Sequence, residues 1–219
     1  MQQTRDLIVR LLRSLGTRKE VEQYLKQYSE APSQKFAVTK VSGDVLAKDM
    51  DALVSSLSFL HRVGLSPIVV HGAGGPLDDA QESERKVVLR ENLRLVEALE
   101  AMGTRARPVP TGVFEVSAAS GGETLSVTLD AVHSTLRSGH LPIVAALGET
   151  AGGQAVHVDA DTAADAIALA IEPYKVIVLT GAGGVLDGRG GVVSAINLAE
   201  DYGSLMAEPW LDDETRARL

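Results

Sequence analysis

The sequence contains no cysteine, few aromatic residues and no long apolar run. The absence of cysteine excludes disulfide bonds and thiolate chemistry, and it is typical of a cytoplasmic protein. Aromatic residues make up only 4% of the 219 residues, which argues against a surface that stacks nucleic-acid bases. The longest apolar runs are as long as strands, far below the roughly 20 residues that a membrane-spanning helix needs. The first thirty residues alternate charge with leucine, so we expect no secretory signal.

Positive charge is also scarce. The chain has 21 Lys and Arg against 29 Asp and Glu, a formal net charge of −8, and such a balance argues against a nucleic-acid partner. A small phosphate-bearing ligand is not excluded, because its site needs only a few local donors. Hydrophobic residues make up 45% and charged residues 23%, as in an ordinary globular protein with one sizeable core.

The first 31 residues predict a helical arm. Leucines and isoleucine recur at helical spacing from Leu7 to Leu15, Gly16 ends that helix, and Thr17 with Glu20 forms a capping box for a second one. Both helices have an apolar stripe, which either packs on the chain's own domain or joins subunits into a homo-oligomer. We therefore divide the chain into an arm (1–31) and a main domain (35–219).

The main domain alternates strand and helix patterns. Such alternation predicts a three-layer αβα sandwich around a mainly parallel central sheet. Strands are expected at 36–41, 67–71, 113–116, 124–129, 141–147, 154–158 and 175–179, and helices at 49–63, 84–102, 130–138, 161–171 and 197–206. The strands at 141–147 and 175–179 are expected to be buried, and the long helix to turn Val88, Leu89, Leu93, Val96 and Leu99 inward.

Glycine-rich turns follow several of these strands. Lys40 ends the first strand just before Ser42 and Gly43, and the second strand runs into Gly72–Gly75. Backbone N–H groups reach an anion where no Cβ intervenes, and a lysine supplies charge, so these turns indicate a phosphate site. Because ligands bind at the carboxyl ends of parallel strands, the turns at 40–43, 71–75, 148–150 and 180–184 are expected to share one rim.

Four segments together resemble the amino acid kinase family: Thr-Lys-Val-Ser-Gly at 39–43, Val-Val-His-Gly-Ala-Gly at 69–74, Val-Asp-Ala-Asp at 158–161 and Leu-Thr-Gly-Ala-Gly-Gly-Val-Leu-Asp at 179–187. Within it the chain is most similar to N-acetylglutamate kinases and the kinase domains of bifunctional synthase/kinases. The similarity runs in order over nearly the whole chain. It implies transfer of a phosphoryl group from ATP, with Mg2+, to the side-chain carboxylate of N-acetyl-L-glutamate in arginine synthesis.

The resemblance also implies residue roles. Lys40 would bind the transferring phosphoryl group, and Asp161 would hold the active-site lysines in position. The acceptor would lie against Gly72, Ala73, Gly74, His157 and Asp159. The nucleotide would lie along Ser42, Gly43, Thr180, Gly181, Gly183, Gly184 and Asp187. No metal held by protein groups is expected, because His157 and Asp159 have no third ligand nearby in the sequence.

The chain departs from the family pattern at several of these places. Ser42 replaces a glycine, and His157 and Asp159 replace asparagines. The short stretch between Gly75 and Glu84 lacks the family's lid arginine, and the second catalytic lysine would fall on Arg218. These differences favour a second hypothesis: an inactive, regulatory, arginine-sensing or assembly module of an N-acetylglutamate synthase, whose acetyltransferase domain would follow. A third hypothesis is an unrelated small nucleotide-binding protein.

Simpler roles compete with the functional ones. Lys40 could be a surface lysine, and the Gly72–Gly75 turn could merely permit a tight connection. Asp161 could be an ordinary N-cap, because it stands where a helix begins. His71 is expected to hold its loop by hydrogen bonding and has no chemical role in this prediction.

Overall fold

The computed structural model describes residues 36–73, 83–119, 122–193, 196–211 and 215–216. The chain divides into two compact units, residues 1–178 and 179–219, and each is described by itself. The predicted helical arm at 1–31, together with Gly74, Gly75 and Arg218, lies outside the described residues.

A five-stranded sheet forms the centre of the first unit. The strands stand in the order β3 (Ala106–Val109), β6 (Leu141–Ala145), β2 (Ile68–His71), β1 (Val38–Val41) and β9 (Val176–Leu179). The β1–β2, β2–β6 and β3–β6 pairs are parallel. In these parallel pairs the carboxyl ends of β1, β2 and β6 meet at one edge, because Val41 is opposite His71 and His71 is opposite Ala145.

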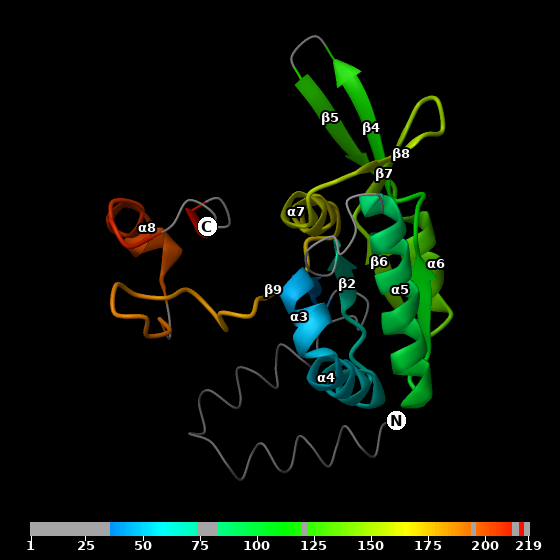
Figure 1. Cartoon of the computed structure of the whole chain (residues 1–219), viewed down its shortest axis with the longest axis horizontal. Coiled ribbons are helices and arrows are strands. Elements are labelled where there is room, and N and C mark those ends of the chain that lie inside the picture. The colour runs from blue at the N-terminus through cyan, green and yellow to red at the C-terminus, as the bar shows by residue number, and fades with distance from the viewer. Residues whose placement is uncertain (1–35, 74–82, 120–121, 194–195, 212–214, 217–219) are drawn as a thin grey trace. The chain divides into compact units, whose positions relative to one another are not determined.

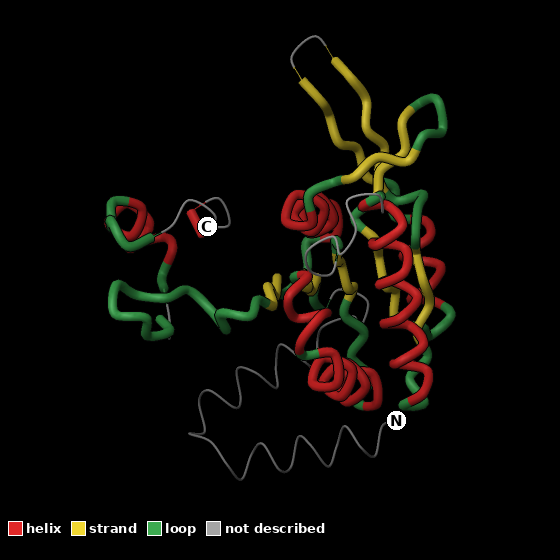
Figure 2. The backbone as a smooth tube through the Cα atoms, viewed as in Figure 1, coloured by secondary structure: helices red, strands yellow, loops and turns green. Residues whose placement is uncertain are grey.

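Helices cover both faces of this sheet, and the strands lie between them (Figure 2). The helices are α3 (Gly43–Lys48), α4 (Met50–Arg62), α5 (Glu84–Ala101), α6 (Asp130–Arg137) and α7 (Ala160–Ile171). Strand side chains alternate between faces, so a strand buried on both sides is mainly apolar. On one face Val38 and Val70 join a core with Ala163 and Ile167 of α7 and Val132 of α6. On the other, Ala145 and Leu147 pack against Val88 of α5.

A second, four-stranded sheet adjoins the carboxyl end of β6. Its order is β5 (Gly122–Val127), β4 (Phe114–Ala119), β7 (Leu147–Thr150) and β8 (Ala155–His157). β4 and β5 form an antiparallel hairpin that projects away from the helices of this unit (Figure 1). The prediction of a loop rim at 148–150 is therefore wrong, because these residues form β7.

The predicted αβα sandwich is confirmed, with several local corrections. Strand β3 was not expected, and the predicted strand at 141–147 breaks at Ala146 into β6 and β7. Leu93 was expected to face inward but is 53% exposed. Strand β9 is present, yet Val176 and Val178 are exposed, so the prediction that this strand is buried is wrong.

The second unit contains a glycine-rich hairpin and a helix. An antiparallel bridge joins Leu186 to Val192, and α8 spans Leu198–Met206. Trp210 packs on the hairpin, because a Cβ at Gly188 would lie 3.2 Å from its ring. In the part of the chain that the structure describes, no helix is long and apolar enough to cross a membrane.

Candidate active site

Lys40 is a buried cation near the carboxyl end of β1. It lies two residues after Val38 and so projects from the same face of the sheet, toward α7. Its Nζ lies 2.8 Å from Oδ1 and 2.9 Å from Oδ2 of Asp161, across 121 residues of sequence. The Lys40 side chain is 5% exposed and that of Asp161 29%, so the pair opens to solvent on the carboxylate side. The interpretation of Lys40 as a surface lysine is wrong.

The start of α7 positions Asp161. Asp159 is the N-cap, and its Oδ1 accepts hydrogen bonds from the Thr162 N–H at 2.9 Å and the Thr162 hydroxyl at 3.1 Å. The suggestion that Asp161 caps this helix is therefore wrong. Asp161 instead lies in the first turn, where the helix dipole stabilises a carboxylate.

The carboxylates around this turn differ in pKa. Burial works to raise the pKa of Asp159, but hydrogen bonds from Thr162 and the Asp161 N–H, with the Lys40 charge, hold it below its ordinary value. Burial and the charges of Asp161 and Asp159 raise the pKa of Asp165. Among the described residues, no group of three potential ligands could hold a metal ion. The site therefore combines the ammonium of Lys40 with the carboxylates of Asp159, Asp161 and Asp165.

The turn after β2 lies close to the start of α7, which carries Asp161. A Cβ at Gly72 would lie 3.4 Å from the Cβ of Ala160, the residue next to Asp161. Ala73 packs on the core formed by Val88, Ala145 and Leu147. The structure therefore brings Lys40, Asp161 and Gly72 together at one edge of the sheet, whereas Gly74 lies outside the described residues.

His71 holds this turn, as the sequence predicted. Its Nδ1 lies 2.9 Å from the Gly72 carbonyl oxygen, and its Nε2 lies 2.9 Å from Nδ2 of Asn92 on α5. Complete burial lowers the pKa of His71 to about 4, although the Gly72 carbonyl acts in the opposite direction. The ring is therefore neutral at physiological pH. Asn92 was not predicted from the sequence; its only signal was a polar residue on the buried stripe of an amphipathic helix.

The other candidates in the first unit have local partners. The Nε2 of His157, on β8, lies 3.2 Å from Oε1 of Glu84 at the start of α5. Ser42 is the N-cap residue of α3 and donates its hydroxyl hydrogen bond to Asp44. Gly43 is the first residue of α3 and directly follows that cap.

The remaining candidates, Thr180, Gly181, Gly183, Gly184 and Asp187, lie in the second unit, which is described by itself. Asp187 organises the hairpin there, because its Oδ1 accepts hydrogen bonds from the N–H groups of Arg189 and Gly191, both at 2.8 Å. Gly183 has φ +78°, a conformation that favours glycine, and its N–H donates to the Thr180 carbonyl at 3.1 Å.

Known proteins resemble this chain over most of its length. It is 40% identical to acetylglutamate kinase of Xanthomonas campestris pv. campestris, with 94% of this chain and 54% of the relative covered. It is 38% identical to the mitochondrial protein arg11 of Schizosaccharomyces pombe, with all of this chain and 28% of the relative covered. That alignment has 247 positions against the 219 residues of this chain, so the relative carries segments that this chain lacks.

The chain thus spans about half the length of the bacterial relative and less of the fungal one. Among solved structures, N-acetylglutamate synthase of Neisseria gonorrhoeae, in complex with coenzyme A and L-arginine, matches with a TM-score of 0.63. The match has 18% identity and covers 88% of this chain and 55% of the other, and it supports the fold alone. The model of the amino acid kinase family matches residues 35–208. The chain belongs to the amino acid kinase family.

Proposed function

We propose that this chain is an N-acetylglutamate kinase-like phosphotransferase domain, which moves a phosphoryl group from MgATP to the side-chain carboxylate of N-acetyl-L-glutamate. The single observation that carries the proposal is the buried Lys40–Asp161 pair at the edge where β1 and β2 end. The names of the curated relatives supply the acceptor, since acetylglutamate kinase of Xanthomonas campestris pv. campestris is similar over nearly the whole chain.

Lys40 would neutralise the charge of the transferring phosphoryl group. Such transfers need little covalent chemistry from the protein, so positioning and charge stabilisation provide most of the catalysis. Asp161 would keep the ammonium aimed at the reacting atoms, because both its oxygens contact Nζ. An ammonium that is already desolvated and held in place loses little free energy in reorganising when the anion arrives.

The residues present fit ATP better than they fit a protein-bound metal. The described carboxylates near Lys40 form no metal-binding group, so Mg2+ would arrive with the nucleotide phosphates. The nucleotide itself would extend along the turn that begins at Thr180, and the acceptor along the Gly72 turn and the segment from His157 to Asp159.

The test is turnover by the full chain with MgATP and N-acetyl-L-glutamate. ADP release and trapping of the acyl phosphate with hydroxylamine measure the two products. Lys40→Met is expected to lower kcat by about 10²–10³-fold, the usual loss when one donor to a developing anion is removed. Lys48→Met, which replaces an exposed lysine of α3, is the matched control and should leave turnover unchanged. Absence of both products from the wild-type chain would refute the proposal.

A second candidate function is a regulatory or assembly module that binds L-arginine without turnover, as part of a longer synthase with an acetyltransferase domain. The observation in its favour is that the relatives carry segments that this chain lacks. Binding of L-arginine by calorimetry, in a chain that forms no ADP, would favour this function over the first. Turnover that Lys40→Met abolishes would exclude an inactive module.

A further inference from the structure

A buried chain of hydrogen bonds runs from α5 to the turn after β2. Asn92 Nδ2 lies 2.9 Å from the Ile143 carbonyl oxygen of β6 and 2.9 Å from His71 Nε2. His71 Nδ1 lies 2.9 Å from the Gly72 carbonyl oxygen. Asn92 and His71 are 1% and 0% exposed, so water does not compete for these bonds.

The direction of each bond follows from the donors available. An amide NH2 carries two hydrogens, and the carbonyl of Ile143 can only accept, so one hydrogen points to Ile143 and the other to Nε2 of His71. Nε2 is therefore the acceptor, and the single ring proton resides on Nδ1, which donates to Gly72. Burial, which lowers the pKa of His71 to about 4, keeps the ring in this neutral state.

This bond fixes the orientation of the peptide between Gly72 and Ala73. In a planar trans peptide the C=O and the following N–H point in opposite directions. There are no cis peptide bonds among the described residues, so the bond from His71 to the Gly72 carbonyl aims the Ala73 N–H away from the imidazole. Within the described part of the chain, no residue accepts a hydrogen bond from the Ala73 N–H.

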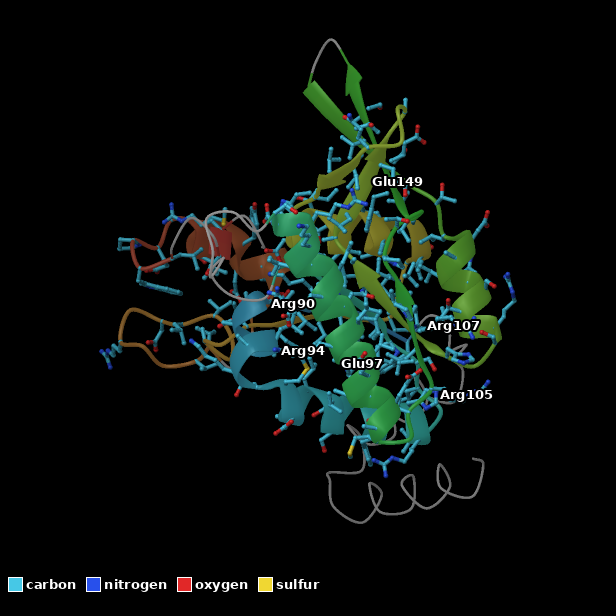
Figure 3. All side chains as sticks on the ribbon, turned by 45° about the vertical axis from the view of Figure 1, so that its right-hand side comes forward. Arg90, Arg94, Glu97, Arg105, Arg107 and Glu149 are labelled. Carbon is cyan, nitrogen blue, oxygen red and sulfur yellow. The ribbon has the colours of Figure 1, made fainter. Side chains whose placement is uncertain are left out.

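Helix α5, which carries Asn92, is itself fixed by contacts of Arg94. Arg94 forms an ion pair with Glu91 at 3.1 Å and donates a hydrogen bond to the Leu46 carbonyl of α3. Figure 3 shows Arg90 and Arg94 on the side of α5 that faces α3. α5 is thereby tied to the helix that follows Ser42, and Asn92 is presented to His71 from a fixed backbone.

We propose that His71 is a positioning residue, held in its Nδ1–H form by Asn92, that turns the Ala73 N–H outward as a donor to a phosphoryl oxygen. The donation to phosphate rests on the proposed function, whereas the orientation of the peptide does not. A Cβ at Gly72 would lie 3.4 Å from the Cβ of Ala160, the residue before Asp161, so the donor lies at the edge of the sheet that carries Lys40.

Nuclear magnetic resonance of the 15N-labelled full chain tests the hydrogen-bond chain without any need for turnover. Two-bond 1H–15N spectra should show His71 protonated at Nδ1 alone between pH 6 and 8. The isosteric variant Asn92→Asp replaces the donor to Nε2 by an acceptor, so it should place a proton on Nε2. A proton on Nε2 in the wild type, or none there in Asn92→Asp, would overturn the inference.

Two substitutions of His71 then test the role of the ring. The side-chain amide nitrogen of Asn lies near the position of Nδ1 and that of Gln near the position of Nε2, so only His71→Asn keeps a donor to Gly72. On addition of MgATP, the Ala73 amide resonance should shift in the wild type and in His71→Asn but not in His71→Gln. If the two variants respond alike, His71 does not position this amide.

Kinetics separate this inference from the proposed function. His71→Gln should lower kcat by about 10²-fold with a smaller change in KM, and His71→Asn should restore most of kcat. Leu99→Ala is the control for lost packing, because Leu99 is buried in the C-terminal half of α5. This variant is expected to be less stable than the wild type but to keep its kcat. Normal turnover in all three variants would refute the positioning role alone. No turnover in the wild type, with the predicted Ala73 shifts, would refute the proposed function alone.

Discussion

Lys40 and Asp161 differ in how deeply they are buried, and this difference separates activity from stability. Lys40 is almost fully covered, so its ammonium depends on Asp161 for compensation, whereas the carboxylate retains access to water. Removal of one partner from a buried pair leaves an unpaired charge, but replacement of the buried charge by an apolar side chain of similar shape removes the problem.

We therefore expect Asp161→Asn to lower the free energy of unfolding by about 1–3 kcal/mol, because the buried Lys40 side chain loses its carboxylate partner. Lys40→Met should keep or raise the free energy of unfolding while it loses phosphoryl transfer. Urea unfolding of both single variants and of the double variant measures these changes. A Lys40→Met protein that is less stable than Asp161→Asn would contradict this view of the pair.

The lowered pKa of His71 leads us to expect that the stability of the fold depends on pH. Its pKa is about 4 in the folded chain against an ordinary value of 6.5 for the exposed ring, so between these values the unfolded chain binds more protons. Unfolding then becomes easier as the pH falls through this window, by about 2 kcal/mol between pH 7 and pH 5. His71→Asn removes the titrating ring and should lack this part of the slope in urea unfolding. Equal slopes in the two proteins would show that the ring titrates normally in the fold.

At the level of elements, Gly148 decides how closely β4, β7 and β8 approach. A Cβ there would lie 2.7 Å from Cγ2 of Val116 on β4 and 3.1 Å from Cγ2 of Val158, the residue that follows β8. Both neighbours are β-branched and cannot turn aside cheaply. Gly148→Ala should therefore lower the free energy of unfolding by about 1–3 kcal/mol. Gly152→Ala, whose Cβ would lie 3.8 Å from its nearest neighbour, is the control and should be nearly neutral in the same measurement.

Elements with a clear period were predictable from the sequence, and those with a mixed pattern were not. β1, β2, α4 and α7 follow the apolar spacing closely, whereas β3 carries Arg107 and Pro108 and so does not read as a strand. On α5 the buried face includes Glu91 and Asn92 in place of apolar residues, and this shifted the predicted stripe onto Leu93.

The site was predictable only in part, because local sequence patterns do not show how distant elements pack. Strand ends and glycine turns indicated Lys40 and Gly72, and the family resemblance supplied Asp161. Local spacing could not decide between Asp159 and Asp161 as the cap of α7, because either residue could begin that helix. The bond from Asn92 to His71 depends on how α5 packs against β2, which the sequence does not state.

For the whole molecule, the proposed function predicts that its ligands stabilise the folded chain. The proposed phosphoryl contacts lie in the first unit, and the proposed nucleotide residues from Thr180 to Asp187 lie in the second. A ligand that binds only the folded chain stabilises it by RT ln(1 + [L]/Kd), about 2.7 kcal/mol at a concentration of 100 Kd. Stabilisation by MgATP therefore measures how tightly the folded chain binds the nucleotide.

We expect MgATP and N-acetyl-L-glutamate each to raise the thermal midpoint of the full chain, and calorimetry to give matching heats. Lys40→Met should lose most of the response to MgATP, because the phosphates lose their cation, while Lys48→Met should keep it. A response to L-arginine alone would instead point to a sensor, since that ligand carries no phosphate for Lys40 to bind. If none of the three ligands stabilises the chain, the edge defined by Lys40 and Gly72 has no role in binding them.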